Sequence, residues 1–130
     1  MARKPTSVMI VDDNDMMRTI LRSILRGEEY DVIGEARNGV IAVDMAERLK
    51  PDIVCLDVMM PEMDGLEALG AIKSARPEIQ IVMITSNTEP ETVQDAIQNG
   101  AAGYIVKPFN AARVLDTLEK IVGRRRQKPA

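Results

Sequence analysis

The chain has 130 residues, a formal net charge of −3 from 17 basic and 20 acidic residues, and a single cysteine. This length accommodates one compact domain and leaves no room for a second. The charge excludes a bulk electrostatic attraction to nucleic acid or to an acidic membrane, and one cysteine excludes an internal disulfide and any multi-cysteine metal site.

The amino terminus has only four apolar residues, 8–11, after a polar start, far fewer than a signal-peptide core or a membrane span needs. Cys55 lies inside an apolar run, where it serves as a small hydrophobic residue. We therefore expect a soluble, monomeric protein of the reducing cytoplasm that binds neither membrane nor nucleic acid.

The first half of the chain alternates apolar runs with helical spacing. Residues 8–11 form a predicted strand, and apolar residues three and four apart then predict a helix that stops before Gly27: Met17, Ile20, Leu21, Ile24 and Leu25. Residues 31–35 form a weaker predicted strand. A helix then begins at Asn38, ends before Pro51 and turns four side chains inward: Ala42, Val43, Ala46 and Leu49.

The second half continues this alternation. We predict strands at 53–56, 80–84 and 103–106, and helices at about 65–74, 89–98 and 110–123. Five strands alternating with five helices indicate an α/β fold, in which a doubly wound parallel sheet is covered on both faces. The nearly continuous apolar strands agree with burial on both sides.

The predicted helix at 89–98 differs from the others, because its inward stripe is only Val93, Ala96 and Ile97. So small an apolar anchor predicts a loosely held helix that can shift at low cost in free energy. The alternative is simply a short exposed helix, and the sequence favours neither.

The basic segment at residues 124–130, Arg-Arg-Arg-Gln-Lys-Pro-Ala, is the only charge run. We divide the chain into a domain at 1–123 and this basic tail at 124–130, and expect the tail to be a solvated, frayed terminus. A nucleic-acid arm or a membrane tether is the alternative, but the tail has no aromatic residues and no folded reader beside it.

Four of the predicted strands end at polar residues: Asp12 with Asp13, Asp57, Thr85 and Lys107. The carboxyl ends of parallel strands lie side by side, and open α/β sheets place their sites there. Each residue alone could be a helix cap or a solvated strand end. Together, three carboxylates, a hydroxyl and an ammonium in one crevice indicate a phosphoryl-transfer site.

The three carboxylates need a cation, since two negative charges about 4 Å apart repel by roughly 4 kcal/mol at an effective dielectric constant near 20. Oxygen ligands without sulfur or imidazole suit a hard ion, so we predict Mg²⁺, with Mn²⁺ as a substitute. Lys107 can neutralise a phosphoryl oxygen, and Thr85 offers a hydroxyl donor. A carboxylate such as Asp57 could then attack an activated phosphoryl group and become an aspartyl phosphate.

Two competing motifs fail. The acidic run at 12–15 lacks the glycine and the closing glutamate of a calcium loop. A flavodoxin-like nucleotide site needs a small or glycine-rich turn after the first strand, where this chain has two carboxylates that would repel phosphate without a metal ion.

Four motifs resemble the receiver domain of bacterial two-component response regulators: Val11-Asp12-Asp13, Leu56-Asp57-Val58-Met59-Met60-Pro61-Glu62-Met63-Asp64-Gly65, Thr85-Ser86 and Lys107-Pro108-Phe109. The resemblance covers about residues 7–122 and is to stand-alone regulators of the chemotaxis CheY type. It implies a flavodoxin-like sheet in the order 2-1-3-4-5.

The resemblance also implies roles for the site residues. Asp57 would accept a phosphoryl group from a sensor histidine kinase or a phosphotransfer domain. Asp13 and Asp57 would bind the metal ion directly and Asp12 through water, and the backbone carbonyl of Met59 would add a ligand. Lys107 would precede a cis peptide bond.

In the family, Thr85 moves its hydroxyl toward the phosphoryl group, and Tyr104 then rotates inward. The helix at 89–98, the last strand and the last helix would carry this change to a downstream protein, for which the CheY type suggests a flagellar motor switch. Ser86 and Asn87 border the site, so a phosphatase could reach the phosphate. Alternatively, Tyr104 merely covers the core at the sheet edge.

Two other functions remain open. A haloacid-dehalogenase-like phosphatase also uses an aspartyl phosphate, but its nucleophile begins an Asp-x-Asp-x-Thr/Val element, which neither Asp13 nor Asp57 does here. A constitutive interaction domain would never be phosphorylated. We expect a switch that catalyses only its own phosphorylation and dephosphorylation, and not an enzyme that turns over a metabolite.

Overall fold

The structure is a computed structural model that describes residues 5–127. Its elements, in chain order, are β1 (Thr6–Val11), α1 (Asp15–Arg26), β2 (Tyr30–Ala36), α2 (Gly39–Leu49), β3 (Ile53–Leu56), α3 (Gly65–Ala75), β4 (Gln80–Thr85), α4 (Pro90–Gln98), β5 (Gly103–Val106) and α5 (Ala111–Gln127). The predicted alternation of strands and helices is confirmed. The ends of the predicted domain and tail, residues 1–4 and 128–130, lie outside the described residues.

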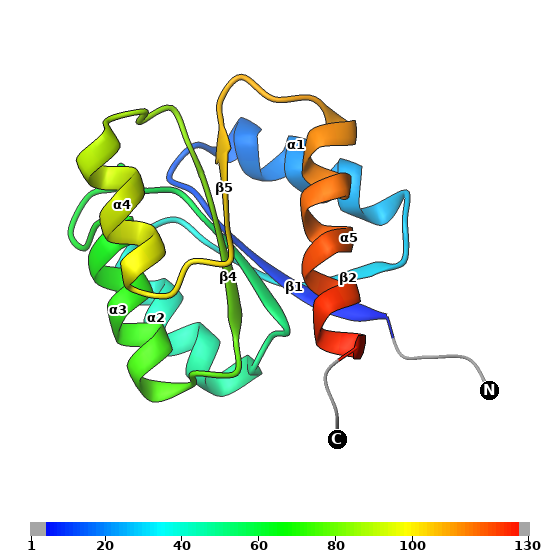
Figure 1. The fold of residues 1–130 in the computed structure, drawn as a ribbon, viewed down its shortest axis with the longest axis horizontal. Coiled ribbons are helices and arrows are strands. Elements are labelled where there is room, and N and C mark those ends of the chain that lie inside the picture. Colours follow the sequence, from blue (N-terminus) through cyan, green and yellow to red (C-terminus); the bar gives the residue numbers. More distant parts are fainter. Residues whose placement is uncertain (1–4, 128–130) are drawn as a thin grey trace.

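All five strands are parallel and lie in the order β2-β1-β3-β4-β5, as predicted (Figure 1). The register aligns the strand ends: Val11 of β1 pairs with Leu56 of β3, and Thr85 of β4 pairs with Val106 of β5. The polar residues at and after these positions therefore lie along one edge of the sheet.

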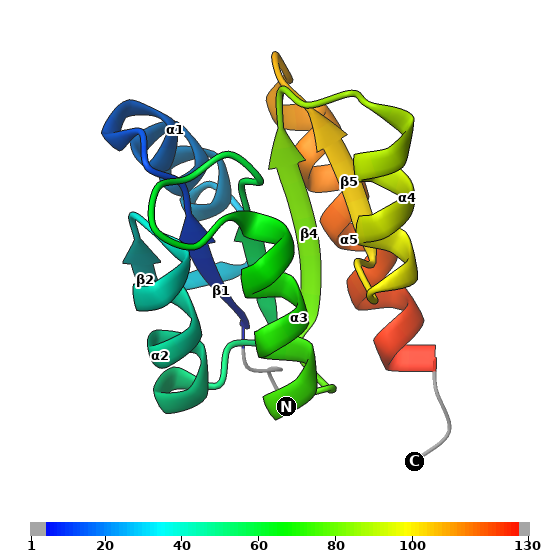
Figure 2. The same ribbon diagram turned by 90° about the vertical axis from the view of Figure 1, so that its left-hand side faces the viewer.

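Helices α1 and α5 cover one face of the sheet, and α2, α3 and α4 cover the other (Figures 1 and 2). A hydrophobic core lies on each face of the sheet, and alternate residues of β1 pack into one or the other. Val8 and Ile10 pack on the side of α1 and α5, and Met9 and Val11 pack on the opposite side. The strands are thus buried on both faces, which explains their continuous apolar runs.

Two side chains predicted to point inward are exposed, Ile97 of α4 by 58% and Leu49 of α2 by 39%. Both predictions were wrong. The three apolar residues of α4 are too few to fix which side of the helix faces the sheet, and only Ala96 is buried. Leu49 lies next to Gly34 of β2. This strand is at the edge of the sheet, and no other strand of the described residues lies beyond it to help cover Leu49.

Helix α5 continues to Gln127, so the predicted helix end at residue 123 is too early. Arginine and glutamine have high helix propensity, and cations are favourable near a helix C-terminus. Residues 124–127 of the segment that we assigned to a tail therefore extend the helix. No helix within residues 5–127 has the length and apolar character that a membrane span requires.

Candidate functional site

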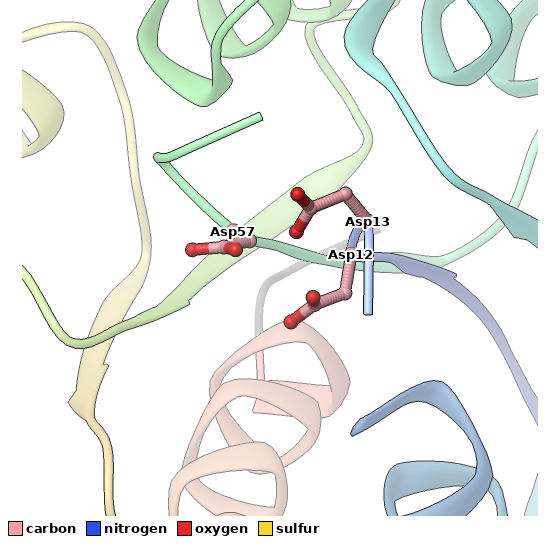
Figure 3. A group of neighbouring side chains, drawn as sticks. All are labelled: Asp12, Asp13 and Asp57. Carbon is pink, nitrogen blue, oxygen red and sulfur yellow. The ribbon is translucent and has the colours of Figure 1, made fainter. Parts of the chain in front are cut away.

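Three carboxylates meet at the carboxyl edge of the sheet. Asp12, Asp13 and Asp57 each offer one oxygen, and these oxygens all lie within 4.8 Å of one another (Figure 3). Asp12 and Asp13 follow β1 and Asp57 follows β3, so two adjacent parallel strands bring them together. The structure thus brings together the carboxylates that the sequence predicted to converge.

Asp12 is 2% exposed, and each of its polar groups has a partner. Its N–H donates to the Ala36 carbonyl at 3.1 Å, and its carbonyl accepts from the Arg18 guanidinium at 2.6 Å. Its carboxylate accepts from the Asn14 N–H at 2.9 Å and from Lys107 Nζ at 2.8 Å. The Asp12 carboxylate is therefore held in one orientation by protein donors.

Asp13, by contrast, is exposed, and within the described residues its carboxylate has no hydrogen bond or ion pair. Nothing in residues 5–127 competes for its oxygens. The direction of the Asp13 carboxylate therefore depends on the backbone that joins Asp13 to Asp12.

Asp57 is 5% exposed. Its N–H donates to the Val11 carbonyl at 3.0 Å, which extends the pairing of β3 with β1 by one residue. One carboxylate oxygen lies 3.6 Å from Lys107 Nζ, and the other accepts from the Met59 N–H at 3.4 Å. The phosphoacceptor candidate is thus nearly buried, next to a cation.

Burial raises the pKa of Asp57 above its ordinary value, and the negative charge of Asp12 raises it further. The Lys107 ammonium lowers this pKa, as do hydrogen bonds from the Thr85 hydroxyl and the Met59 N–H. A negative charge on Asp57 next to that of Asp12 is unfavourable, so an added cation would favour the ionised form of Asp57.

Only glycine fits at position 65, beside the backbone of Asp57 and Val58. A Cβ at this position would lie 2.1 Å from the Asp57 carbonyl oxygen and 2.6 Å from the Val58 Cα. The Gly65 N–H also donates to the Val58 carbonyl at 2.8 Å. The sequence contains this glycine within a motif, but only the structure shows why a larger residue does not fit.

Lys107 follows β5 and bridges two of the carboxylates, at 2.8 Å from Asp12 and 3.6 Å from Asp57. The predicted cis peptide bond between Lys107 and Pro108 is present. The Lys107 N–H donates to the Thr85 carbonyl at 2.9 Å, which continues the pairing of β5 with β4. The ammonium thus enters the crevice from the far strand of the sheet.

Thr85 is fully buried, and its hydroxyl accepts from the Asn87 N–H at 3.3 Å. The Tyr104 hydroxyl donates to the Asn87 carbonyl at 2.6 Å. Burial raises the pKa of Tyr104, and the charges of Asp57 and Glu89 raise it further. Asn87 therefore joins the two predicted switch residues, a role that we did not predict.

Two further site predictions concern the borders of the crevice. The Met59 side chain is 62% exposed, and its N–H contacts Asp57, whereas the metal-binding role of its carbonyl stays a prediction. Ser86 is exposed and Asn87 is half-buried, so both lie where an outside molecule could reach them.

Arg18 of α1 and Glu35 of β2 also lie beside the site, although we did not predict a role for either. Arg18 pairs with Asp15, with Glu35 and with the Asp12 carbonyl. The spacing of Asp15 and Arg18 on one helix predicts their ion pair, but the bond to a loop carbonyl requires the folded loop.

Comparison with known proteins connects this geometry to a family. Residues 8–119 match the family described as the response regulator receiver domain. The chain is 47% identical to the chemotaxis protein CheY of Listeria monocytogenes over 113 residues, which cover 87% of this chain and 95% of that protein.

Solved structures agree. The CheX-CheY-BeF3-Mg²⁺ complex from Borrelia burgdorferi matches with a TM-score of 0.88 at 32% identity, covering 91% of this chain and 90% of that one. A CheY-like receiver domain protein from Methanospirillum hungatei matches with a TM-score of 0.90 at 24% identity, covering 95% of this chain and 98% of that one, and shares the fold.

Proposed function

Because this chain belongs to the response regulator receiver family, we propose that it is a phosphorylation-controlled switch in which Asp57 accepts a phosphoryl group. The donor would be the phosphohistidine of a sensor kinase or of a phosphotransfer domain. The switch would act by changing its affinity for another protein, and it would catalyse only its own phosphorylation and dephosphorylation.

The convergence of Lys107 and Thr85 on Asp57 carries this proposal. Asp57 lies 3.6 Å from the Lys107 ammonium, and the neighbouring Thr85 hydroxyl lowers the pKa of Asp57, whereas Asp13 has no ion pair with Lys107 within the described residues. This arrangement favours Asp57 as the nucleophile. It speaks against a dehalogenase-like phosphatase, in which the first carboxylate of the Asp13 element would attack.

The transfer exchanges one bond to phosphorus for another. An Asp57 oxygen would bond to phosphorus as the phosphorus–nitrogen bond of the donor breaks, and the imidazole would leave with a proton. Lys107 and the Thr85 hydroxyl can both donate to the new phosphoryl oxygens, and hydrogen bonds to charged groups contribute about 1.5–3 kcal/mol each. The chain's own contribution is position and charge compensation.

The acidic cluster fits Mg²⁺, because its donors are all oxygens and only one or two carboxylates are needed. Asp13 and Asp57 would bind the ion directly, together with the Met59 carbonyl. Asp12 would act through water, since both of its oxygens already accept hydrogen bonds. When bound, the ion offsets the repulsion between the carboxylates and the phosphoryl oxygens. The Borrelia complex contains Mg²⁺ together with BeF3.

The connection from Thr85 through Asn87 to Tyr104 supports a switch toward α4. A phosphoryl group that draws the Thr85 hydroxyl away would release its hydrogen bond with the Asn87 N–H. The Tyr104 hydroxyl holds the carbonyl of the same residue, so the loop into α4 would respond. Ile97 and Val106 are exposed on α4 and β5 and would contact the partner, together with α5.

The relatives named chemotaxis protein CheY make a chemotaxis target, such as a flagellar motor switch, the first partner to examine. A phosphatase could also reach Asp57, and the Borrelia CheY relative is in complex with CheX. We propose that the protein acts in the cytoplasm as a monomer.

The deciding experiment is labelling with acetyl phosphate and Mg²⁺, read by intact-protein mass. The wild type should gain one phosphoryl group, Asp57→Asn should gain none, and EDTA should abolish the label. Asp116→Asn on α5, an exposed carboxylate outside the site, is the matched control and should label normally. Label retained on Asp13 in Asp57→Asn would favour a phosphatase, and an unlabelled wild type would favour a constitutive interaction domain.

Beryllium trifluoride tests the switch separately from the chemistry. With Mg²⁺, this phosphoryl mimic should shift the NMR signals of Thr85, Asn87 and Tyr104, and those of α4 more than those of α3. A pull-down with and without the mimic would then identify targets that bind only the switched form. A spectrum unchanged by the mimic would contradict the switch.

A further inference from the structure

Two arginines on one side of α1 share a carboxylate of β2. Arg18 Nε lies 3.5 Å from one oxygen of Glu35, and Arg22 Nη1 lies 2.5 Å from the other. Arg18 also pairs with Asp15 at the start of the helix. Like charges four residues apart repel on a helix, so Glu35 stabilises a pair that would otherwise be unfavourable.

Only one of these arginines contacts the segment of Asp12 and Asp13 that follows β1. Arg18 Nη1 donates to the Asp12 carbonyl at 2.6 Å, and the Arg18 side chain is only 15% exposed. Arg22 has no such contact within the described residues, and its contact is with Glu35. Both arginines therefore contact Glu35, but only Arg18 also contacts the Asp12 carbonyl.

The carbonyl that Arg18 holds belongs to the peptide that joins Asp12 to Asp13. Because this unit is planar, fixing its oxygen fixes the direction in which the chain continues to Asp13. The Asp12 carboxylate has its own donors, whereas that of Asp13 has none in residues 5–127. The orientation of Asp13 thus depends on its backbone.

We infer that Arg18, held by Glu35, is a positioning residue that sets the direction of the Asp13 carboxylate for a divalent cation. This inference rests on the Mg²⁺ site of the proposed function. Arginine suits the role because its planar fork can donate to the Asp12 carbonyl, Asp15 and Glu35 at the same time, which the single ammonium of lysine cannot do with the same geometry.

The test compares Arg18→Ala with Arg22→Ala, which removes the other guanidinium from Glu35 and leaves the Asp12 carbonyl contact in place. Mg²⁺ is titrated into the full, unphosphorylated chain by calorimetry. Groups that orient metal ligands typically change affinity by about 10- to 100-fold, so Arg18→Ala should weaken binding at least about tenfold and Arg22→Ala by less than about threefold. Arg18→Lys should restore part of the loss.

A second readout needs no metal ion. In the apo protein, Arg18→Ala should shift the amide NMR signals of Asp13 and Asn14, and Arg22→Ala should leave them unchanged. If Arg18→Ala does not fold, Arg18→Lys against Arg22→Lys replaces the pair, with the same order of affinities expected.

The outcomes separate the two proposals. If Arg18→Ala binds Mg²⁺ with the same affinity as the wild type, the positioning role is overturned and the proposed function stays intact. Equal weakening by both alanine variants also overturns it, because the arginines would then act only through Glu35 and general packing. Absence of Mg²⁺ binding by the wild type overturns both proposals.

Discussion

Helices α3 and α4 cover the same face of the sheet and follow the two strands that lead to Asp57 and Thr85, yet they are attached very differently (Figure 2). Helix α3 buries Gly65, Ala68, Leu69 and Ile72, whereas α4 buries only Ala96. The Asp64 carboxylate caps α3 by accepting the Glu67 N–H at 2.9 Å, but α4 begins without a side-chain cap.

If the proposed switch is correct, this difference separates a fixed half of the site, next to α3, from a half that can respond, next to α4. Burial of one large aliphatic side chain stabilises by about 1.5–3 kcal/mol; α3 has Leu69 and Ile72 fully inside, and α4 has none. A shift of α4 would therefore cost little more than a few hydrogen bonds. The exposed Ile97 supports a loosely held helix that offers an apolar side chain to a partner.

The largest effect should come from truncating Leu69, a buried anchor of α3, and the exposed Ile97 of α4 is its counterpart. Leu69→Ala should lower the free energy of unfolding by about 2–5 kcal/mol, because it leaves a cavity in a packed core. Ile97→Ala should change it by less than about 0.5 kcal/mol. Urea denaturation measures both, and a large loss in Ile97→Ala would show that α4 is anchored after all.

A pair of glycine substitutions tests how closely α3 is joined to Asp57, the proposed phosphoacceptor. Gly65→Ala should cost about 1–3 kcal/mol or more and abolish labelling of Asp57, since its Cβ would collide with the Asp57 carbonyl. Gly70→Ala, in the same helix with open space around the new Cβ, should stabilise by about 0.5–1 kcal/mol. Normal labelling of Gly65→Ala would show that the strand end can move without loss of chemistry.

The sequence was sufficient for the features that depend on residue type and strand order. Parallel strands align their carboxyl ends, so polar residues after apolar runs had to meet, as Asp12, Asp57, Thr85 and Lys107 do. The continuous apolar runs likewise indicated a sheet buried on both faces.

The features that the sequence could not predict depend on local geometry. The exposure of Ile97 follows from the rotation of a helix with too few apolar residues to fix it. The contact of Arg18 with the Asp12 carbonyl and that of Tyr104 with Asn87 end at backbone atoms, whose positions no side-chain pattern encodes. The continuation of α5 past residue 123 agrees with the high helix propensity of arginine and glutamine.

Helix capping should produce smaller and opposite effects on the two helices. Asp64→Ala removes the cap of α3 and should lower the free energy of unfolding by about 1 kcal/mol. Glu89→Asp keeps the charge and places a carboxylate at the proper distance to cap α4, which should stabilise by about 0.5–1 kcal/mol. Amide hydrogen exchange should show slower exchange in α4 of Glu89→Asp, and unchanged exchange would mean that its first turn is already satisfied.

The smallest effect should come from the loop that leads into α3. Glu62 has φ of 69°, a left-handed conformation that costs free energy for most side chains and less for asparagine. Glu62→Asn should therefore stabilise the protein by about 0.5 kcal/mol in urea denaturation. Because this loop joins the fixed half of the site, hydrogen exchange in α4 should not change. Altered exchange in α4 would show that the loop couples the two helices, and their separation into a fixed and a responsive element would then fail.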